Sequence, residues 1–126
     1  MIIGSGFIGS ECAASLKSHF KDKVQVHMIG MEEFPLELAL GKDVARLFQK
    51  EHQENGVVLH MQKGVKEITA DSDGKATGVV LSDDASVEGD LVIVGVGVGP
   101  ATKWLSRTEN GIKVDKFGGI LVDPSL

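Results

Sequence analysis

The sequence predicts an α/β fold in which helices cover a parallel sheet and one crossover is a small antiparallel β-meander. Three observations predict it. A β-branched segment runs into glycines and then into a helical pattern within residues 1–20, β-prone segments with an Asp-Gly turn signal occupy 65–88, and a continuous apolar segment, Leu91–Val94, follows them. A strand, a helix and a strand within about thirty residues form a βαβ unit, whose two strands are parallel.

The first predicted strand, residues 1–3, ends in a glycine motif. Gly4, Gly6 and Gly9 have the spacing G-x-G-x-x-G, directly after two isoleucines and directly before a helical pattern. Gly4 allows the tight turn, Gly6 lacks the Cβ that would hold a pyrophosphate away, and Gly9 lets the helix lie close to the sheet. The helix N-terminus presents N–H groups to phosphates. The motif therefore predicts a dinucleotide site. The alternative is a glycine-rich loop without a ligand.

A first helix is predicted over Phe7–Phe20, because apolar residues recur at the i, i+4 spacing of a buried helical stripe. The residues of this stripe are Ile8, Cys12, Leu16 and Phe20. Glu11 is expected in the first turn, where a carboxylate complements the helix dipole. A polar link, 21–23, then leads to a second strand over Val24–Ile29.

A second helix is predicted over Lys42–Glu54, after a long link that contains Glu32, Glu33 and Pro35. Asn55-Gly56 ends this helix in the usual C-terminal manner. A third strand follows over Val57–Met61. The side chains expected to face inward from the helix are those of Val44, Leu47 and Phe48.

The next crossover is predicted to be a β-meander instead of a helix. Its strands are Val65–Ala70, Ala76–Leu81 and a short piece at Ser86–Glu88. Asp73-Gly74 between two β-prone segments is a hairpin signal. Leu91–Val94 is apolar throughout, which is typical of a parallel, central strand buried on both faces.

The end of the chain is expected to hold a glycine-rich turn over 95–100, a short helix over 101–106 and two weak strands over 112–115 and 119–123. A strand usually has about five or six residues, yet only three residues precede the first glycine. The opposite end stops just after a β-like segment. We therefore expect this chain to be a piece of a larger protein.

Composition excludes several classes of function. The net charge is −5 and no basic cluster follows a phosphate backbone, so neither nucleic acid nor an anionic membrane is an expected partner. The longest apolar run, Leu91–Val98, is too short to span a bilayer. A single cysteine excludes an internal disulfide, and no secretory signal is recognised, so an intracellular location is expected. No metal site is expected, because ligand spacing is absent among the histidines His19, His27, His52 and His60.

The βαβ unit, the meander and the last glycine turn together resemble the NAD(P)H-binding domain of the pyridine nucleotide–disulfide oxidoreductase superfamily of flavoproteins. Residues 4–11, G-S-G-F-I-G-S-E, are similar to apoptosis-inducing factor and its ferredoxin-reductase-like relatives. Residues 94–102, V-G-V-G-V-G-P-A-T, are most similar to the apoptosis-inducing-factor-3-like branch. The resemblance covers nearly the whole chain and implies a Rossmann-like sheet of the FAD/NAD(P)-binding domain type.

The resemblance also implies roles for particular residues. Backbone N–H groups around Gly6, Phe7 and Ile8 would hold the pyrophosphate. Phe7 stands where the superfamily places an aromatic side chain between nicotinamide and flavin, and the alternative is a core phenylalanine. Glu11 matches a carboxylate near the nicotinamide carboxamide. Gly97 matches the glycine that lets the dinucleotide approach the end of the last parallel strand.

One departure from the pattern concerns the ribose. About 20 residues beyond the glycines, an acid normally binds the adenosine ribose. Here that position is Gly30. Glu32 and Glu33 follow and are placed to reach the ribose hydroxyls, with a solvated loop as the equal alternative. No arginine is near in sequence to neutralise a 2′-phosphate, and two acids would repel one. NADH is therefore favoured over NADPH.

The function implied is that of an NADH-binding domain, residues 1–110, which positions nicotinamide for hydride transfer to the FAD of a parent oxidoreductase. Residues 111–126 would begin the return to the FAD domain. No residue is assigned a catalytic role, and the fragment alone is expected to bind NADH weakly, to carry no flavin and to be inactive. The alternatives are an NADH-sensing Rossmann-like domain and an interaction module, including dimerisation through the surface exposed by separation from the FAD domain. The electron acceptor is not identified, and a mitochondrial location is an expectation from the resemblance alone.

Overall fold

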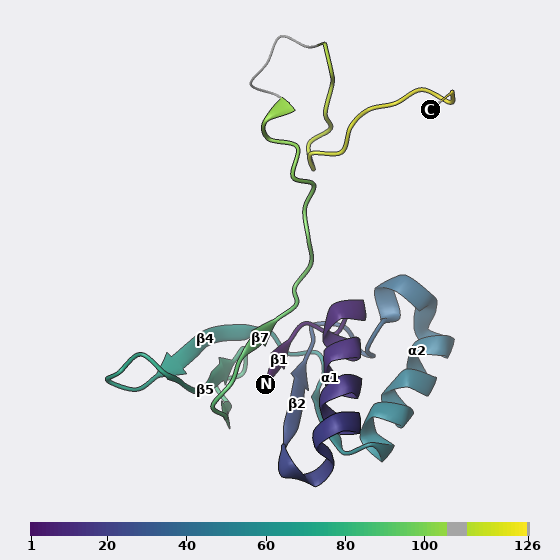
Figure 1. Ribbon diagram of the computed structural model, residues 1–126. Helices are drawn as coiled ribbons and strands as arrows, with labels where there is room; N and C mark the ends of the chain where they lie inside the picture. The colour runs from purple at the N-terminus through teal and green to yellow at the C-terminus, as the bar shows by residue number, and fades with distance from the viewer. Residues whose placement is uncertain (106–110, 126) are drawn as a thin grey trace. The chain divides into compact units, whose positions relative to one another are not determined.

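The computed structural model describes residues 1–105 and 111–125. The chain forms two compact units, Met1–Val96 and Gly97–Leu126. The first unit contains every named helix and strand of the described residues (Figure 1). The predicted domain boundary between 110 and 111 and the end of the predicted helix over 101–106 fall on residues outside the described part. That boundary stays a prediction.

A parallel sheet forms the centre of the first unit, with the strand order β3-β2-β1-β7. The strands are β1 (Ile2–Ile3), β2 (Val26–Ile29), β3 (Val57–His60) and β7 (Ile93–Val94). In the middle of this sheet, Ile2 pairs with Met28 on one side and with Ile93 on the other. The glycine turn that follows β1 therefore lies at the carboxyl edge of the sheet, between the ends of β2 and β7. Ligands of open α/β sheets bind at such an edge.

Two helices cover one face of this sheet, α1 (Phe7–Phe20) and α2 (Glu37–Glu54), and a 3₁₀ turn over Lys21–Lys23 joins α1 to β2 (Figure 1). The predicted bounds of the first helix are confirmed. Its predicted buried stripe is wrong at both ends, because Ile8 is 45% and Phe20 is 42% exposed. The side of α1 that is buried on the sheet carries Gly9 and Ala13 instead. Small side chains bring the helix axis close to the strands, which turns the larger residues outward.

The second helix begins earlier than predicted. α2 starts at Glu37, and Gly41, with φ 74° and ψ 165°, interrupts it just before the predicted start at Lys42. The inward-facing residues are Ala45 and His52, which are both buried. The prediction that Val44, Leu47 and Phe48 face inward is wrong, because α2 is buried along the side that carries Ala45 and His52. The residues left exposed are Val44, Leu47 and Phe48.

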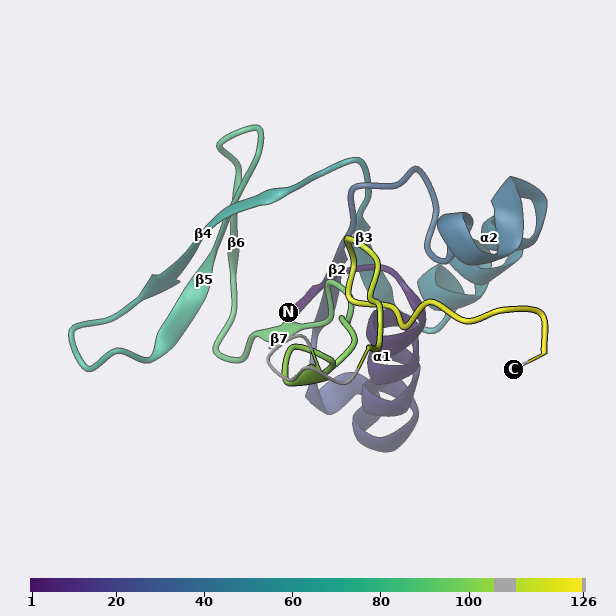
Figure 2. The ribbon, with the colours of Figure 1, turned by 90° about the horizontal axis from the view of Figure 1, so that it is seen from above.

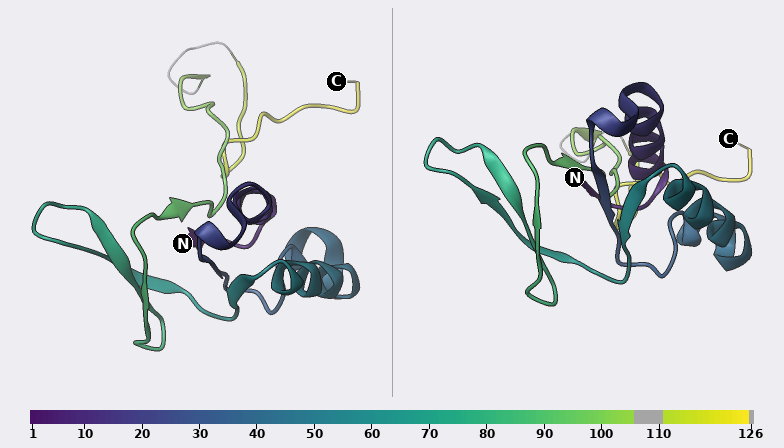
Figure 3. Two further views of the ribbon diagram at one scale, coloured as in Figure 1. Left: turned by 60° about the horizontal axis from the view of Figure 1, so that its bottom comes forward. Right: turned by 90° about the horizontal axis from the view of Figure 1, so that it is seen from below.

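An antiparallel sheet lies on the opposite face of the parallel sheet from the helices (Figures 2 and 3). Its strands β4 (Val65–Ala70), β5 (Ala76–Leu81) and β6 (Ser86–Glu88) have the predicted bounds. A hydrophobic cluster of Ile29, Val79, Leu81 and Val87 joins the two sheets. The predicted β-meander crossover, and with it the predicted fold class, is confirmed.

The last strand corrects one prediction. β7 is parallel to β1, as expected, but it is an outer strand of the described sheet instead of a central one. Leu91 and Val94 are 58% and 57% exposed, because no strand within the described residues pairs with the other edge of β7. In the second unit, the two weak strands predicted near the C-terminus are reduced to one antiparallel bridge between Val114 and Ile120.

Candidate dinucleotide-binding site

The first glycine turn touches the start of the second. Gly4 has φ 109°, and its N–H donates a hydrogen bond to the Ile29 carbonyl at 2.8 Å. A Cβ at Gly4 would lie 2.3 Å from the carbonyl oxygen of Gly95. The Gly95 N–H in turn donates to the Ile3 carbonyl at 2.7 Å. The ends of β1 and β7 thus meet backbone to backbone, which only a residue without a side chain permits at position 4.

Gly9 and Gly6 have opposite surroundings. A Cβ at Gly9 would lie 2.0 Å from the Gly4 carbonyl oxygen, so the predicted close approach of helix and strand is confirmed. A Cβ at Gly6 would meet no atom within 4 Å. Gly6 is the N-cap of α1, and no side chain caps this helix. The N–H groups of a first helical turn have no intrahelical partner. Open space in front of such donors suits a pyrophosphate.

Phe7 and Glu11 follow Gly6 on α1. Phe7 is the first helical residue and is 54% exposed, so it is not a core phenylalanine. Ile8 beside it is also exposed. Glu11 was expected in the first turn of this helix. That prediction is wrong, because the helix begins at Phe7 and its first turn contains no acid. The helix dipole acts mainly within the first turn, so it does not account for a carboxylate at position 11.

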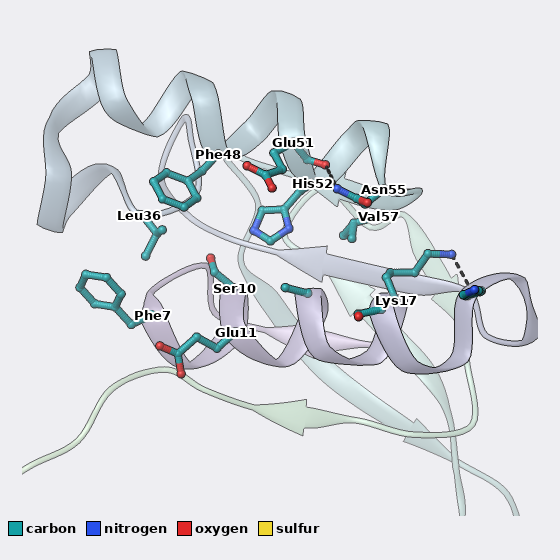
Figure 4. A pocket seen from close by; sticks show the side chains of 13 residues that line it. Phe7, Ser10, Glu11, Lys17, Leu36, Phe48, Glu51, His52, Asn55 and Val57 are labelled. Carbon is teal, nitrogen blue, oxygen red and sulfur yellow. Dashed lines mark hydrogen bonds between the residues drawn. The ribbon is translucent and has the colours of Figure 1, made fainter.

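A groove with a volume of about 690 Å³ runs between α1 and α2 (Figure 4). Phe7 and Leu36 lie at one end and Lys17 at the other. Within the described part of the chain, Ser10 Oγ and His52 Nε2 are buried in it without a hydrogen-bond partner. Phe7 and Glu11, two of the predicted site residues, line this groove, so it adjoins the glycine turn through the first residues of α1. Sequence patterns gave no sign of the groove itself.

The two glutamates after β2 are in different environments. Glu32 is half-buried, and its Oε2 accepts a hydrogen bond from Ser5 Oγ at 2.8 Å, which places the carboxylate beside the glycine turn. Glu33 accepts a hydrogen bond from Lys42 Nζ at 2.6 Å. Lys42 also lies 3.7 Å from a carboxylate oxygen of Glu37. From the sequence, both Glu32 and Glu33 were candidates for the ribose, and Glu32 was the predicted site residue. Ser5 was missed, because the hydrogen bond joins residues that are far apart in the chain.

At the end of β2, steric contact with Ser5 leaves no room for a side chain at Gly30. A Cβ at Gly30 would lie 2.3 Å from Ser5 Oγ and 2.7 Å from Ser5 Cβ. The side chain of Ser5 therefore fills the place that a side chain at position 30 would need. An acid at position 30 would therefore require the Ser5 side chain to move.

Gly97 belongs to the second unit and has φ 115°, with no atom within 4 Å of a Cβ built on it. This φ favours glycine. Its role at the end of the last parallel strand stays a prediction.

Two histidines on neighbouring strands form a pair that sequence reasoning also missed. His27 Nδ1 and His60 Nε2 are 2.9 Å apart, with ring centroids 5.2 Å apart and planes inclined by 19°. This geometry places the rings edge to edge, joined by one N–H···N hydrogen bond. Burial lowers the pKa of both histidines, and the nearby His60 lowers that of His27 further. Burial also lowers the pKa of His52. No group of three or more metal-ligating side chains occurs among residues 1–105 and 111–125.

We expect the free energy of unfolding to fall as the pH drops below about 6.5, the ordinary pKa of histidine. The pKa values of His27, His52 and His60 are lower in the folded chain, so the unfolded chain binds more protons below that pH. The stabilisation is complete above the unfolded pKa and is lost toward acid. Urea unfolding between about pH 8 and pH 5 measures it. His60→Gln should flatten the dependence, because it removes one of the three histidines with a lowered pKa. A slope equal to that of the unchanged chain would contradict this account.

The fold and its glycine turn define a class: an α/β domain of the FAD/NAD(P)-binding type, with a β-meander crossover. The family model of pyridine nucleotide-disulphide oxidoreductases matches residues 1–126, and the chain belongs to this family. Members of the family are FAD-dependent NAD(P)H oxidoreductases. None of the helices in the described residues is long and apolar enough to cross a membrane.

Several known proteins are similar. The chain is 37% identical over 120 residues to the 5,5'-dehydrodivanillate O-demethylase ferredoxin reductase subunit of Sphingobium, covering 92% of this chain and 28% of that protein. It is 36% identical over 128 residues to human apoptosis-inducing factor 3, covering 100% of this chain and 20% of that protein. The crystal structure of the ferredoxin reductase for the CYP199A2 system of Rhodopseudomonas palustris matches with a TM-score of 0.85 and 31% identity, over 97% of this chain and 28% of that one. The chain thus spans between a fifth and a third of each relative's length.

Proposed function

We propose that this chain is the NADH-binding part of an FAD-dependent oxidoreductase and positions nicotinamide for hydride transfer to the flavin. The observation that carries the proposal is the open space at Gly6, in front of a helix that no side chain caps. Membership of an oxidoreductase family supports the same assignment. The competing role, an NADH sensor without a flavin partner, would use the same space but has no observation in its favour.

The residues of the glycine turn have two different roles in the proposed binding. Gly4 and Gly9 hold β1, α1 and β7 together, so that the first N–H groups of the helix face one space. Backbone N–H groups at Gly6, Phe7 and Ile8 would hold the pyrophosphate. Bound NADH supplies the hydride. The chain contributes orientation, which is a large part of catalysis in such domains.

Two side chains and one glycine would set the nicotinamide end. The exposed ring of Phe7 would stand beside nicotinamide, and the Glu11 carboxylate would accept a hydrogen bond from its carboxamide. Glu11 is exposed on α1 one turn beyond Phe7, so both side chains are available to a ligand. Gly97 would let the dinucleotide approach the second glycine turn.

The proposed partner within the parent protein is the FAD domain. Apolar side chains of α2 support a contact surface, since Leu38 is 86% and Leu47 is 67% exposed. Dimerisation of the separated domain through such residues belongs to the same proposal. Assignment to the apoptosis-inducing-factor-3-like branch, with its implied mitochondrial location, rests on the motif of residues 94–102.

We expect NADH to bind at least about tenfold more tightly than NADPH, a difference of about 1.4 kcal/mol. Glu32 would accept a hydrogen bond from the adenosine ribose, and its charge would repel a 2′-phosphate. Calorimetric titration of the chain with each nucleotide measures the preference. Glu32→Ala should bring the two affinities within about threefold of each other, a difference of about 0.7 kcal/mol.

Glu33→Ala is the matched control, because it removes the same charge one residue further along, from a carboxylate paired with Lys42. It should retain the preference for NADH. Absence of binding by either nucleotide would overturn the proposed function. Tighter binding of NADPH would overturn the role of Glu32.

A further inference from the structure

We propose that Ser5, inside the glycine turn, is the positioning residue for selection of NADH over NADPH. Its hydroxyl holds the Glu32 carboxylate at the ribose position, in place of an acid at the end of β2. This inference rests on the proposed function and extends it. It assigns the choice of nucleotide to a contact between the turn and the loop after β2.

Ser5 fastens that loop at two points. Its Oγ donates to Glu32 Oε2 at 2.8 Å, and its carbonyl oxygen accepts a hydrogen bond from the Leu36 N–H at 2.8 Å. Ser5 itself is 3% exposed, so the serine side of both contacts is buried, and the hydrogen bond to Glu32 is partly buried. From the other side, the Gln62 N–H donates to the Glu32 carbonyl at 2.9 Å. Backbone and side chain of Glu32 are therefore both held in place.

Positions 5 and 30 are sterically linked. A Cβ at Gly30 would lie 2.3 Å from Ser5 Oγ, far below contact distance, so a side chain at position 30 and the Ser5 hydroxyl exclude each other. A chain with an acid at position 30 would have to displace the Ser5 side chain. This chain has Ser5, and its carboxylate beside the turn is that of Glu32, two residues after Gly30.

The partner of the Glu32 carboxylate in this hydrogen bond is a neutral hydroxyl and not a cation. A hydroxyl is a neutral donor, so it orients the carboxylate without cancelling its charge, and no lysine or arginine of the described residues forms a salt bridge with Glu32. A carboxylate accepts about four hydrogen bonds, so Oε1 remains available to a ribose hydroxyl. The intact charge opposes a 2′-phosphate. Glu33, paired with Lys42, lacks this combination.

The test is a double-mutant cycle with NADH and NADPH as probes, read by calorimetry. Ser5→Ala keeps the backbone contact to Leu36 and frees only the carboxylate. We expect it to lower NADH affinity about five- to tenfold and to leave NADPH affinity within about twofold, which reduces the preference. In a Glu32→Ala chain, Ser5→Ala should have no further effect on the preference. Ser15→Ala, on the exposed face of α1, is the matched control and should change neither affinity.

The outcomes separate the two proposals. A wild-type chain that binds neither nucleotide overturns both the proposed function and this inference. A wild-type chain that prefers NADH, with the same preference in Ser5→Ala, overturns this inference alone. This inference is also overturned if Ser5→Ala changes the preference for NADH equally in the wild-type chain and in the Glu32→Ala chain. Circular dichroism checks each fold; should Ser5→Ala unfold, Ser5→Cys keeps the size, weakens the donor and is expected to reduce the preference in the same direction.

Discussion

Replacing Gly6 with valine is expected to abolish NADH binding and to leave the fold intact. The backbone at Gly6, with φ −77° and ψ −167°, is extended and accessible to any residue. A Cβ there meets no atom of the described residues within 4 Å, so the larger side chain is accommodated. It would instead occupy the space in front of the first N–H groups of α1. We expect a loss of at least about a hundredfold in affinity, or about 2.7 kcal/mol, measured by calorimetric titration.

Ser15→Val provides the control for this experiment, because it adds the same branched side chain to an exposed position of the same helix. It should bind NADH like the wild type. Circular dichroism and thermal unfolding of both variants show whether the fold is kept. Equal heats of binding in Gly6→Val and the wild type would place the nucleotide elsewhere, and the proposed function would then lose the observation that carries it.

Replacing Gly9 with alanine is expected to have the opposite result, a loss of stability caused by a single methyl group. The new Cβ would lie 2.0 Å from the Gly4 carbonyl oxygen and 3.3 Å from Ile2 Cγ2. The first of these atoms is backbone, so relief requires the helix to move away from β1. Overpacking of this kind costs about 1–3 kcal/mol. We expect about 3 kcal/mol here, because the hydrogen bond to Ile29 fixes Gly4 and because Ile2 is fully buried. Urea unfolding measures the change.

Gly6→Ala is the natural comparison for Gly9→Ala, since it introduces the same group three residues earlier. Its expected change in stability is within about 1 kcal/mol of zero. A Gly9→Ala chain as stable as Gly6→Ala would show that α1 can shift on the sheet without cost. Together the variants separate two tasks within one motif: Gly9 sets the packing of the helix, and Gly6 keeps space for a ligand.

Local patterns predicted the elements of the first unit well. The bounds of α1 and of the three meander strands agree with the structure, because helical periodicity, the glycine motif and Asp73-Gly74 act over a few neighbouring residues. The start of α2 was missed, since Gly41 interrupts a helix that resumes immediately. Patterns also failed to say which side of each helix is buried. In α1 the small residues Gly9 and Ala13 are buried, whereas the larger Ile8 and Phe20 are exposed and Leu16 is only partly buried.

The sequence by itself determined the class of fold and where its glycine turn lies, because a strand, a Cβ-free turn and a helix follow one another along the chain. Only the tertiary structure decided which acid stands beside that turn. Glu32 and Glu33 are equivalent in sequence, but Ser5 bonds one of them and Lys42 the other. The tertiary structure also decided that β7 is an outer strand among the described residues, and that His27 lies beside His60. These contacts join residues that are distant in the chain, and such pairings follow from packing and not from local pattern.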